Sequence, residues 1–199
     1  MASDPEVVEP PSIDGKDKKS MIDYKRDLTK TKMCKMWHNM YDRCYSESYH
    51  ETNPKYKDCT MCDEWLDNKE AFYDWVRENY YTVDNERIDI DKDILIKGNK
   101  IYSPETCVFA PHSINTYFEN LTREPVYSPT INKYKMEICI EGKTINIGYY
   151  DTEEEAKKAY IRHKEAAILA KADLYKDKVP RKLYDAMVNW NIELSDWDK

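Results

Sequence analysis

The chain has 199 residues, of which 41% are hydrophobic and 35% are charged, and its formal net charge is −7. No run of apolar residues approaches the roughly 20 that a bilayer span needs, so the sequence excludes an integral membrane protein. Its 17 Tyr, five Trp and three Phe supply bulky surface for burial, so we expect an aromatic core rather than disorder throughout.

The acidic excess lies in the middle of the chain. Residues 33–129 hold 18 acids and 11 bases, whereas acids and bases balance in 1–32 and in 130–199. This distribution argues against the broad basic face that nucleic-acid binding usually requires. The N-terminal residues have no apolar signal-peptide segment, so we expect a cytoplasmic protein with reduced cysteines and no membrane partner.

Residues 1–28 are predicted to be a flexible tail, because prolines stand there among acids and small polar residues. From Thr29 onward, apolar residues at helical spacing predict an amphipathic helix of about four turns. This stripe comprises Met33, Met36, Trp37, Met40, Tyr41 and Cys44. A second helix is predicted from Trp65 to Val76, with Asn68 as a cap, and the two helices are expected to pack together.

The pattern changes at residue 88. Apolar and acidic residues alternate over 88–91, a turn follows at Gly98, and 101–102 is the expected partner strand. A helix is then predicted from the stripe Ile114, Tyr117, Phe118 and Leu121. The predicted unit is therefore strand, loop, strand and helix.

Two prolines over 123–130 predict a linker between residues 29–122 and 131–199. Alternation over 134–140 and 145–149 predicts a hairpin, and Thr152 with Glu155 forms a capping box before a helix. Pro180 starts a last short helix. The sequence thus predicts a two-part α+β architecture.

Three groups of residues stand out in this order. The first is 37–45 (WHNMYDRCY) with 62–65 (CDEW). The second is 90–93 (IDKD), Asn99, 102–107 (YSPETC) and Ile114-Asn115. The third is 147–156 (IGYYDTEEEA) with 159–160 (AY). Together they resemble a phage-encoded family of HNH endonuclease-like proteins, and the third group is similar to an AP2-type DNA-binding module of three strands and one helix. The resemblance covers residues 33 to about 190.

The HNH resemblance implies a strand pair and a helix around one divalent cation, usually Mg²⁺. It places Asp91 as the carboxylate ligand and Asn115 as the carbonyl ligand. The family has a histidine beside that aspartate to activate water and an asparagine on the second strand to orient it. Lys92 and Thr106 stand at those positions here, so the enzyme assignment stays open, and the candidate catalytic residues are Lys92, Thr106 and His112.

Each of these residues has a second interpretation. As a base at neutral pH, Lys92 needs its pKa lowered by about three units from about 10.4, so a phosphate contact or a salt bridge is the simpler role. His112 is a substitute base or ligand if it shares the helix face of Asn115, or else an exposed histidine at a helix start. Asp91 is either a metal ligand or an acidic residue that limits aggregation at a solvent-exposed strand edge.

Cys59 and Cys62 form one C-x-x-C motif, which invites a zinc interpretation. A second cysteine pair at the right spacing is missing, so zinc is not expected and buried thiols are the simpler outcome. The residues considered as completing ligands are Cys34, His38, Cys44 and Cys107.

The AP2 resemblance implies that one face of the sheet contacts the DNA major groove. The candidate DNA-binding residues are Lys133, Lys135, Lys143 and Asn146, on a face that also carries acids and lacks arginine. We therefore expect modest, strongly salt-dependent affinity for double-stranded DNA.

Two functions are compatible with these features. The first is a phage-type DNA-binding protein of HNH ancestry, and if active a Mg²⁺-dependent endonuclease, in the cytoplasm of a bacterial host. The alternative is a non-catalytic acidic phage protein that binds and inhibits a host protein, such as a nucleic-acid-acting defence complex.

Overall fold

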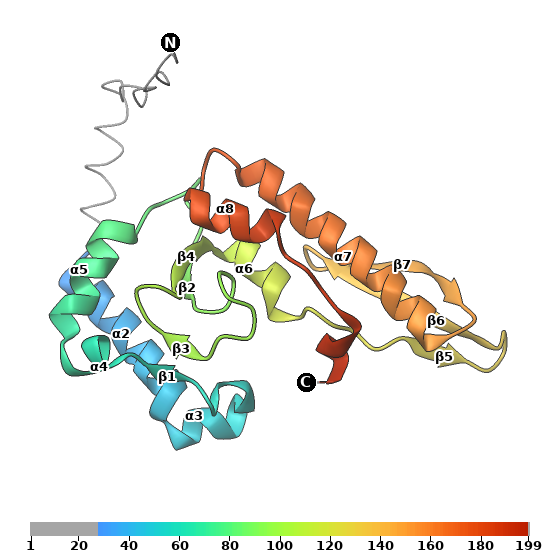
Figure 1. Ribbon diagram of the computed structural model, residues 1–199, viewed down its shortest axis with the longest axis horizontal. Coiled ribbons are helices and arrows are strands. Elements are labelled where there is room, and N and C mark those ends of the chain that lie inside the picture. The colour runs from blue at the N-terminus through green and yellow to red at the C-terminus, as the bar shows by residue number, and fades with distance from the viewer. Residues whose placement is uncertain (1–27, 199) are drawn as a thin grey trace, which may run out of the picture.

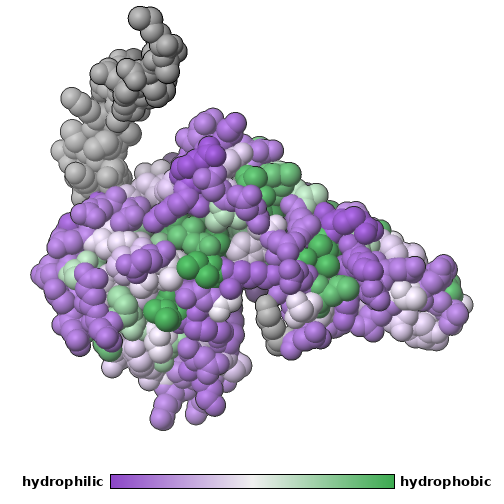
Figure 2. All heavy atoms as spheres, in the orientation of Figure 1, coloured by the Kyte–Doolittle hydropathy of each residue, from purple (hydrophilic) through white to green (hydrophobic). Residues whose placement is uncertain are grey.

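Helices and small sheets alternate through residues 28–198, which the computed structural model describes (Figure 1). The α+β class is confirmed. The predicted tail lies outside the described residues, except for Leu28. Hydrophilic residues cover most of the face drawn in Figure 2, and the hydrophobic residues there form separate small groups. Within residues 28–198, no helix has the length and apolar character needed to cross a bilayer.

The N-terminal elements enclose an aromatic core. They are α2 (Lys30–Tyr45), α3 (Glu47–Thr52), η1 (Pro54–Tyr56), β1 (Thr60–Met61), α4 (Asp63–Asp67) and α5 (Lys69–Asn79). Thr29 caps α2, and the predicted stripe lies inward except for Tyr41, which is exposed. The expected second helix is two helices, because Asn68 caps α5 after α4 has ended. The Trp37 indole donates to the Trp65 carbonyl at 2.8 Å, and the expected packing of these helices is confirmed.

The strand pairing in the middle of the chain differs from the expected one. β2 (Ile88–Asp91) pairs antiparallel with β4 (Val108–Pro111), whereas β3 (Ile101–Tyr102) pairs in parallel with β1. Every residue of β4 is buried, so this apolar run takes the inner position beside β2. The predicted pairing of 88–91 with 101–102 is therefore wrong. The partner of β2 is β4, which was not predicted, and α6 (His112–Glu119) follows β4 directly.

The C-terminal sheet has the strand order β5-β6-β7, with β5 (Val126–Ser128), β6 (Lys133–Ile140) and β7 (Lys143–Tyr150). β5 falls within the predicted linker. The hairpin is confirmed, but a bulge at Met136/Glu137 breaks the expected alternation of β7. Gly148 lies at this bulge with φ +148°, and an added Cβ there would come within 2.8 Å of the Tyr150 hydroxyl. Glycine is therefore required at this position.

α7 (Glu153–Tyr175) begins at the predicted capping box of Thr152 and Glu155. The N-terminal part of α7 covers the sheet, and its second half packs against α8 (Arg181–Val188) and the β4–α6 region. One apolar core, which includes Val108, Ile114 and Ile168, therefore joins both predicted parts of the chain. η2 (Leu194–Asp198) ends the described residues.

The shared core predicts that the two parts unfold together. Ile168→Ala should lower the free energy of unfolding by about 2–4 kcal/mol, because Ile168 is buried in that core. Leu169→Ala is the matched control, since Leu169 is 46% exposed on the same helix, and should change it by less than about 0.5 kcal/mol. Urea unfolding followed by tryptophan fluorescence and far-UV circular dichroism should give coincident transitions. Separate transitions, or equal losses in the two variants, would contradict a shared core.

Candidate functional site

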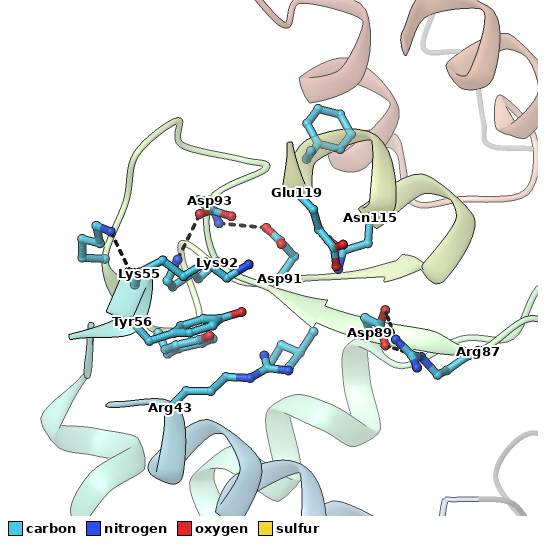
Figure 3. A pocket seen from close by; sticks show the side chains of 14 residues that line it. Arg43, Lys55, Tyr56, Arg87, Asp89, Asp91, Lys92, Asp93, Asn115 and Glu119 are labelled. Carbon is cyan, nitrogen blue, oxygen red and sulfur yellow. Dashed lines mark hydrogen bonds and ion pairs between the residues drawn. The ribbon is translucent and has the colours of Figure 1, made fainter. Parts of the chain in front are cut away.

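A pocket of about 190 Å³ lies where the end of β2 meets α6 and the N-terminal helices (Figure 3). Oxygen-bearing side chains from β2 and α6 line one part of it, and basic side chains from α2, η1 and the loop before β3 line another. Asp91, Lys92 and Asn115, which the resemblance singles out, all line this pocket. The fold therefore brings the end of β2, which carries Asp91, next to α6, which carries Asn115.

Asp91 ends β2, and its Oδ1 accepts backbone hydrogen bonds from Asp93 and Ile94, each 2.8 Å long. These bonds turn the chain away from the strand and fix the carboxyl at the pocket. Burial, and after it the neighbouring Asp93 carboxyl, raise the pKa of Asp91 to about 7. A nearby cation relieves such an arrangement, because it stabilises the ionised form of both carboxyls.

Asn115 supplies a second oxygen. Its Oδ1 is buried and has no hydrogen-bond partner, which among the described residues is otherwise true only of two tryptophan indole nitrogens. Glu119 lies one helical turn further along α6, and Figure 3 shows both side chains extending from the helix toward β2. Glu119 was not among the residues predicted from the sequence, although its i,i+4 spacing from Asn115 placed it on the same helix face.

The basic part of the pocket includes Arg43 and Lys55, with Tyr56 beside them (Figure 3). Lys100 also lines this part. Lys55 lies over the Tyr56 ring at 5.3 Å, and the Lys100 ammonium donates to the Lys55 carbonyl at 3.2 Å. Arg43 was not predicted as a site residue either. It lies in the first group of the resemblance, but no local pattern connects it to Asp91, because long-range packing brings α2 to β2.

Lys92 is 6% exposed, and its ammonium contacts Asp93 at 3.0 Å. Burial opposes its charge, but the Asp93 carboxylate outweighs burial and the pKa of Lys92 lies above its ordinary value. A lysine held in its protonated form cannot accept a proton from water at neutral pH. The geometry therefore favours the salt-bridge interpretation of Lys92 over the catalytic one.

Asn99 fixes the loop that follows Asp91. Its Nδ2 donates to the carbonyls of Lys92 and Ile101, both at 2.7 Å, and so joins the two ends of the turn. Thr106 does not line the pocket: its hydroxyl donates to the Ile101 carbonyl at 2.6 Å and accepts from the Ser103 amide. It therefore organises a local turn before β4.

His112 is the first residue of α6 and does not line the pocket of Asp91. Its Nδ1 lies 2.7 Å from Asp89 and 2.7 Å from the Arg87 guanidinium. Asp89 and Arg87 themselves line the pocket, so His112 stands behind its wall. The structure thus places His112 next to the site without joining it to Asp91 and Asn115.

The candidate DNA-binding residues divide between the two faces of the C-terminal sheet. Lys135 pairs with Tyr149 and Asn146 with Glu137, on the face away from α7, whereas Lys143 pairs with the partly buried Ile140. Lys143 and Asn146 are three positions apart on a regular stretch of β7, so their side chains point to opposite faces and Lys143 does not share the face of the other candidates. Lys133 and Lys135 lie on the outer face and form ion pairs with Asp151 and Glu137.

Cys44, Cys59 and Cys107 are buried in the N-terminal core, Cys34 and Cys62 are partly buried, and Cys139 is exposed. Burial raises the pKa of both Cys44 and Cys107 to about 12, which opposes the thiolate form that zinc requires. Within residues 28–198, no cluster of three or more His, Cys, Asp or Glu side chains is arranged to hold a metal ion. Asp91 and Asn115 do not form such a cluster, because they are only two residues and one of them is an asparagine.

Comparison of the chain with protein-family models, with curated proteins and with solved structures finds no match. Function is therefore inferred from the pocket and from the resemblance of its residues.

Asn99→Ala should lower the free energy of unfolding by about 1–3 kcal/mol, because it leaves the Lys92 and Ile101 carbonyls without their donor. Hydrogen exchange should increase over residues 92–101. Asn120→Ala is the control, since Asn120 is exposed at the end of α6 and its side chain makes no hydrogen bond within the described residues. Unchanged exchange over 92–101 in Asn99→Ala would show that another contact holds the loop.

Proposed function

We propose that this chain is a phage-type nucleic-acid-binding protein of HNH ancestry, whose pocket holds a divalent cation against a phosphodiester. The observation that carries the proposal is the convergence of the Asp91 carboxyl and the unpartnered, buried Oδ1 of Asn115 on one pocket. A buried acceptor without a partner costs about 1–3 kcal/mol, and a cation bound there would remove that cost.

The oxygen atoms of Asp91 and Asn115 suit Mg²⁺ better than a metal ion whose ligands all come from the protein. Mg²⁺ commonly binds through one or two carboxylates, and waters and substrate phosphates complete its shell. Asp91 and Asn115 would hold it, with Glu119 as a further carboxylate in the same pocket. When bound, such a cation stabilises charge on a phosphate and on its leaving oxygen.

The other residues of the pocket fit a phosphate-binding role. Arg43, Lys55 and Lys100 present positive charge beside the oxygen set, which would position the phosphodiester backbone. Lys92 remains protonated through Asp93 and so supplies charge rather than base catalysis. The arrangement supports binding of a cation and a phosphate more strongly than it supports cleavage.

The outer face of the C-terminal sheet is the second part of the proposed interface. Val126, Lys135 and Tyr149 lie side by side across the three strands, and Val126 and Tyr149 are exposed. A lysine between an aliphatic and an aromatic side chain suits contact with a DNA backbone and base edges. Because Glu137 partly neutralises Lys135, the proposed affinity is modest and salt-dependent.

Cation binding is tested by thermal unfolding with and without MgCl₂ or MnCl₂. Either cation should raise the melting temperature of the wild type, and Asp91→Asn and Asn115→Ala should abolish that response. Without metal, Asn115→Ala should be at least as stable as the wild type, because it removes an unpartnered buried oxygen. Asp67→Asn, an exposed control at the end of α4, should respond as the wild type does. A wild type that does not respond to either cation would end the proposal of a cation site.

DNA binding is tested by gel shift on duplex DNA at low salt. Lys135→Ala should weaken binding about three- to tenfold, whereas Lys178→Ala, just beyond the C-terminal end of α7, should change it less than about twofold. Binding should weaken steeply as salt rises.

Plasmid nicking with Mg²⁺ or Mn²⁺, compared between wild type and Asp91→Ala, separates cleavage from binding. Metal-dependent nicking that Asp91→Ala removes would establish an endonuclease. If the wild type neither shifts nor nicks DNA, the alternative of an acidic protein that inhibits a host protein takes its place.

A further inference from the structure

A second cavity, of about 790 Å³, lies where α6 and α7 meet the turn between β6 and β7. Hydroxyl-bearing side chains, aromatic rings and one largely buried lysine form much of its wall. These are Ser113, Thr116, Tyr117, Ile140, Tyr160 and Lys164. Asp91 and Asn115 do not line this cavity, and Glu119 is the residue that lines both cavities.

Lys164 is unusual among the buried lysines of the described residues. Lys92 is paired with Asp93, and Lys171 is paired with Glu141 at 3.1 Å. Lys164 is only 4% exposed, yet within residues 28–198 it has no hydrogen bond and no acidic partner. Its ammonium lies 5.8 Å from the centroid of the Tyr117 ring.

A largely buried lysine without a counter-ion is uncommon, because folded proteins almost always pair such groups, and the Lys164 side chain lines the cavity. Desolvation by burial lowers the pKa of Lys164, as expected where no carboxylate offsets the loss of water. The other charged groups around the cavity do not supply that anion. Glu141 is engaged by Lys171, and Figure 3 shows Glu119 extending toward Asn115 in the other pocket.

We propose that this cavity binds the phosphate group of a nucleotide, with the Lys164 ammonium as its counter-ion. A lysine ammonium is a compact point charge suited to phosphate. The nearby hydroxyls of Ser113 and Thr116 are engaged by Tyr175 and by the Ser113 carbonyl, so Lys164 carries the proposed contact. Tyr117 and Tyr160 offer aromatic surface for a base. The cavity volume falls within the range of about 300–1,000 Å³ that is typical of small-molecule sites.

The nucleotide has two possible sources, a free nucleotide or a nucleotide within a strand. Calorimetric titration of the full chain with AMP, inorganic phosphate and a single-stranded oligo(dA) of eight nucleotides distinguishes them. Binding of AMP would show that the ligand is a free nucleotide. Binding of the oligonucleotide without binding of AMP would show that the ligand is a nucleotide within a strand. Inorganic phosphate should bind more weakly than the tighter of the two, because it lacks the base.

Lys164→Met keeps the length of the side chain and removes its charge, so it should weaken binding of the preferred nucleotide at least about tenfold. Lys158→Met is the matched control, because Lys158 is exposed on the same helix and pairs with Glu154. It should change binding less than about twofold. No binding of any ligand at millimolar concentration, or equal binding by Lys164→Met, would overturn the proposal.

Chemical protection of the wild type provides a test that does not depend on the variant folding. Lysines are acetylated with and without saturating ligand, and modification is measured by mass spectrometry. The ligand should protect Lys164 and leave Lys158 unaffected. Equal acetylation of Lys164 with and without all three ligands would contradict the site.

Discussion

The packing of α6 is the constraint on which both polar sites depend. Ile114 and Tyr117 fix one side of this helix in the core shared with α7 and α8. That packing leaves Asn115 and Glu119 on the side that faces β2, and it makes Tyr117 part of the wall around Lys164. A short helix of eight residues is marginal by itself, so its position is set by burial on its neighbours.

The buried charges give the molecule its chemical character. Two of its three buried lysines are neutralised by acids within the described residues, and the third faces a cavity. The other pocket holds oxygens instead: Asn115 Oδ1 has no hydrogen-bond partner, and burial raises the pKa of the Asp91 carboxyl. An oxygen without a hydrogen-bond partner lines one pocket and a lysine without an acidic partner lines the other. Buried polar groups of this kind are typical of ligand-binding sites.

Local patterns were sufficient for the longer helices, their caps and the C-terminal hairpin. Asn68 and Thr152 were predicted as caps from residue type and spacing, because capping depends on bonds to amides a few positions away. The family resemblance implied that Asp91 and Asn115 bind the same cation. It gave no indication of the buried lysines on α7, since Lys164 and Lys171 look like ordinary surface charges in the sequence.

The sequence by itself determined the main helices, the hairpin and the α+β class, since these depend on periodicity and on contacts between near neighbours. The candidate cation ligands Asp91 and Asn115 were implied by the family resemblance alone. Only the tertiary structure decided that β2 pairs with β4, that a bulge in the hairpin places Tyr149 opposite Lys135, and that one core joins the two parts. Those outcomes depend on which distant apolar surfaces bury one another, and a burial energy summed over many weak contacts leaves no local signature.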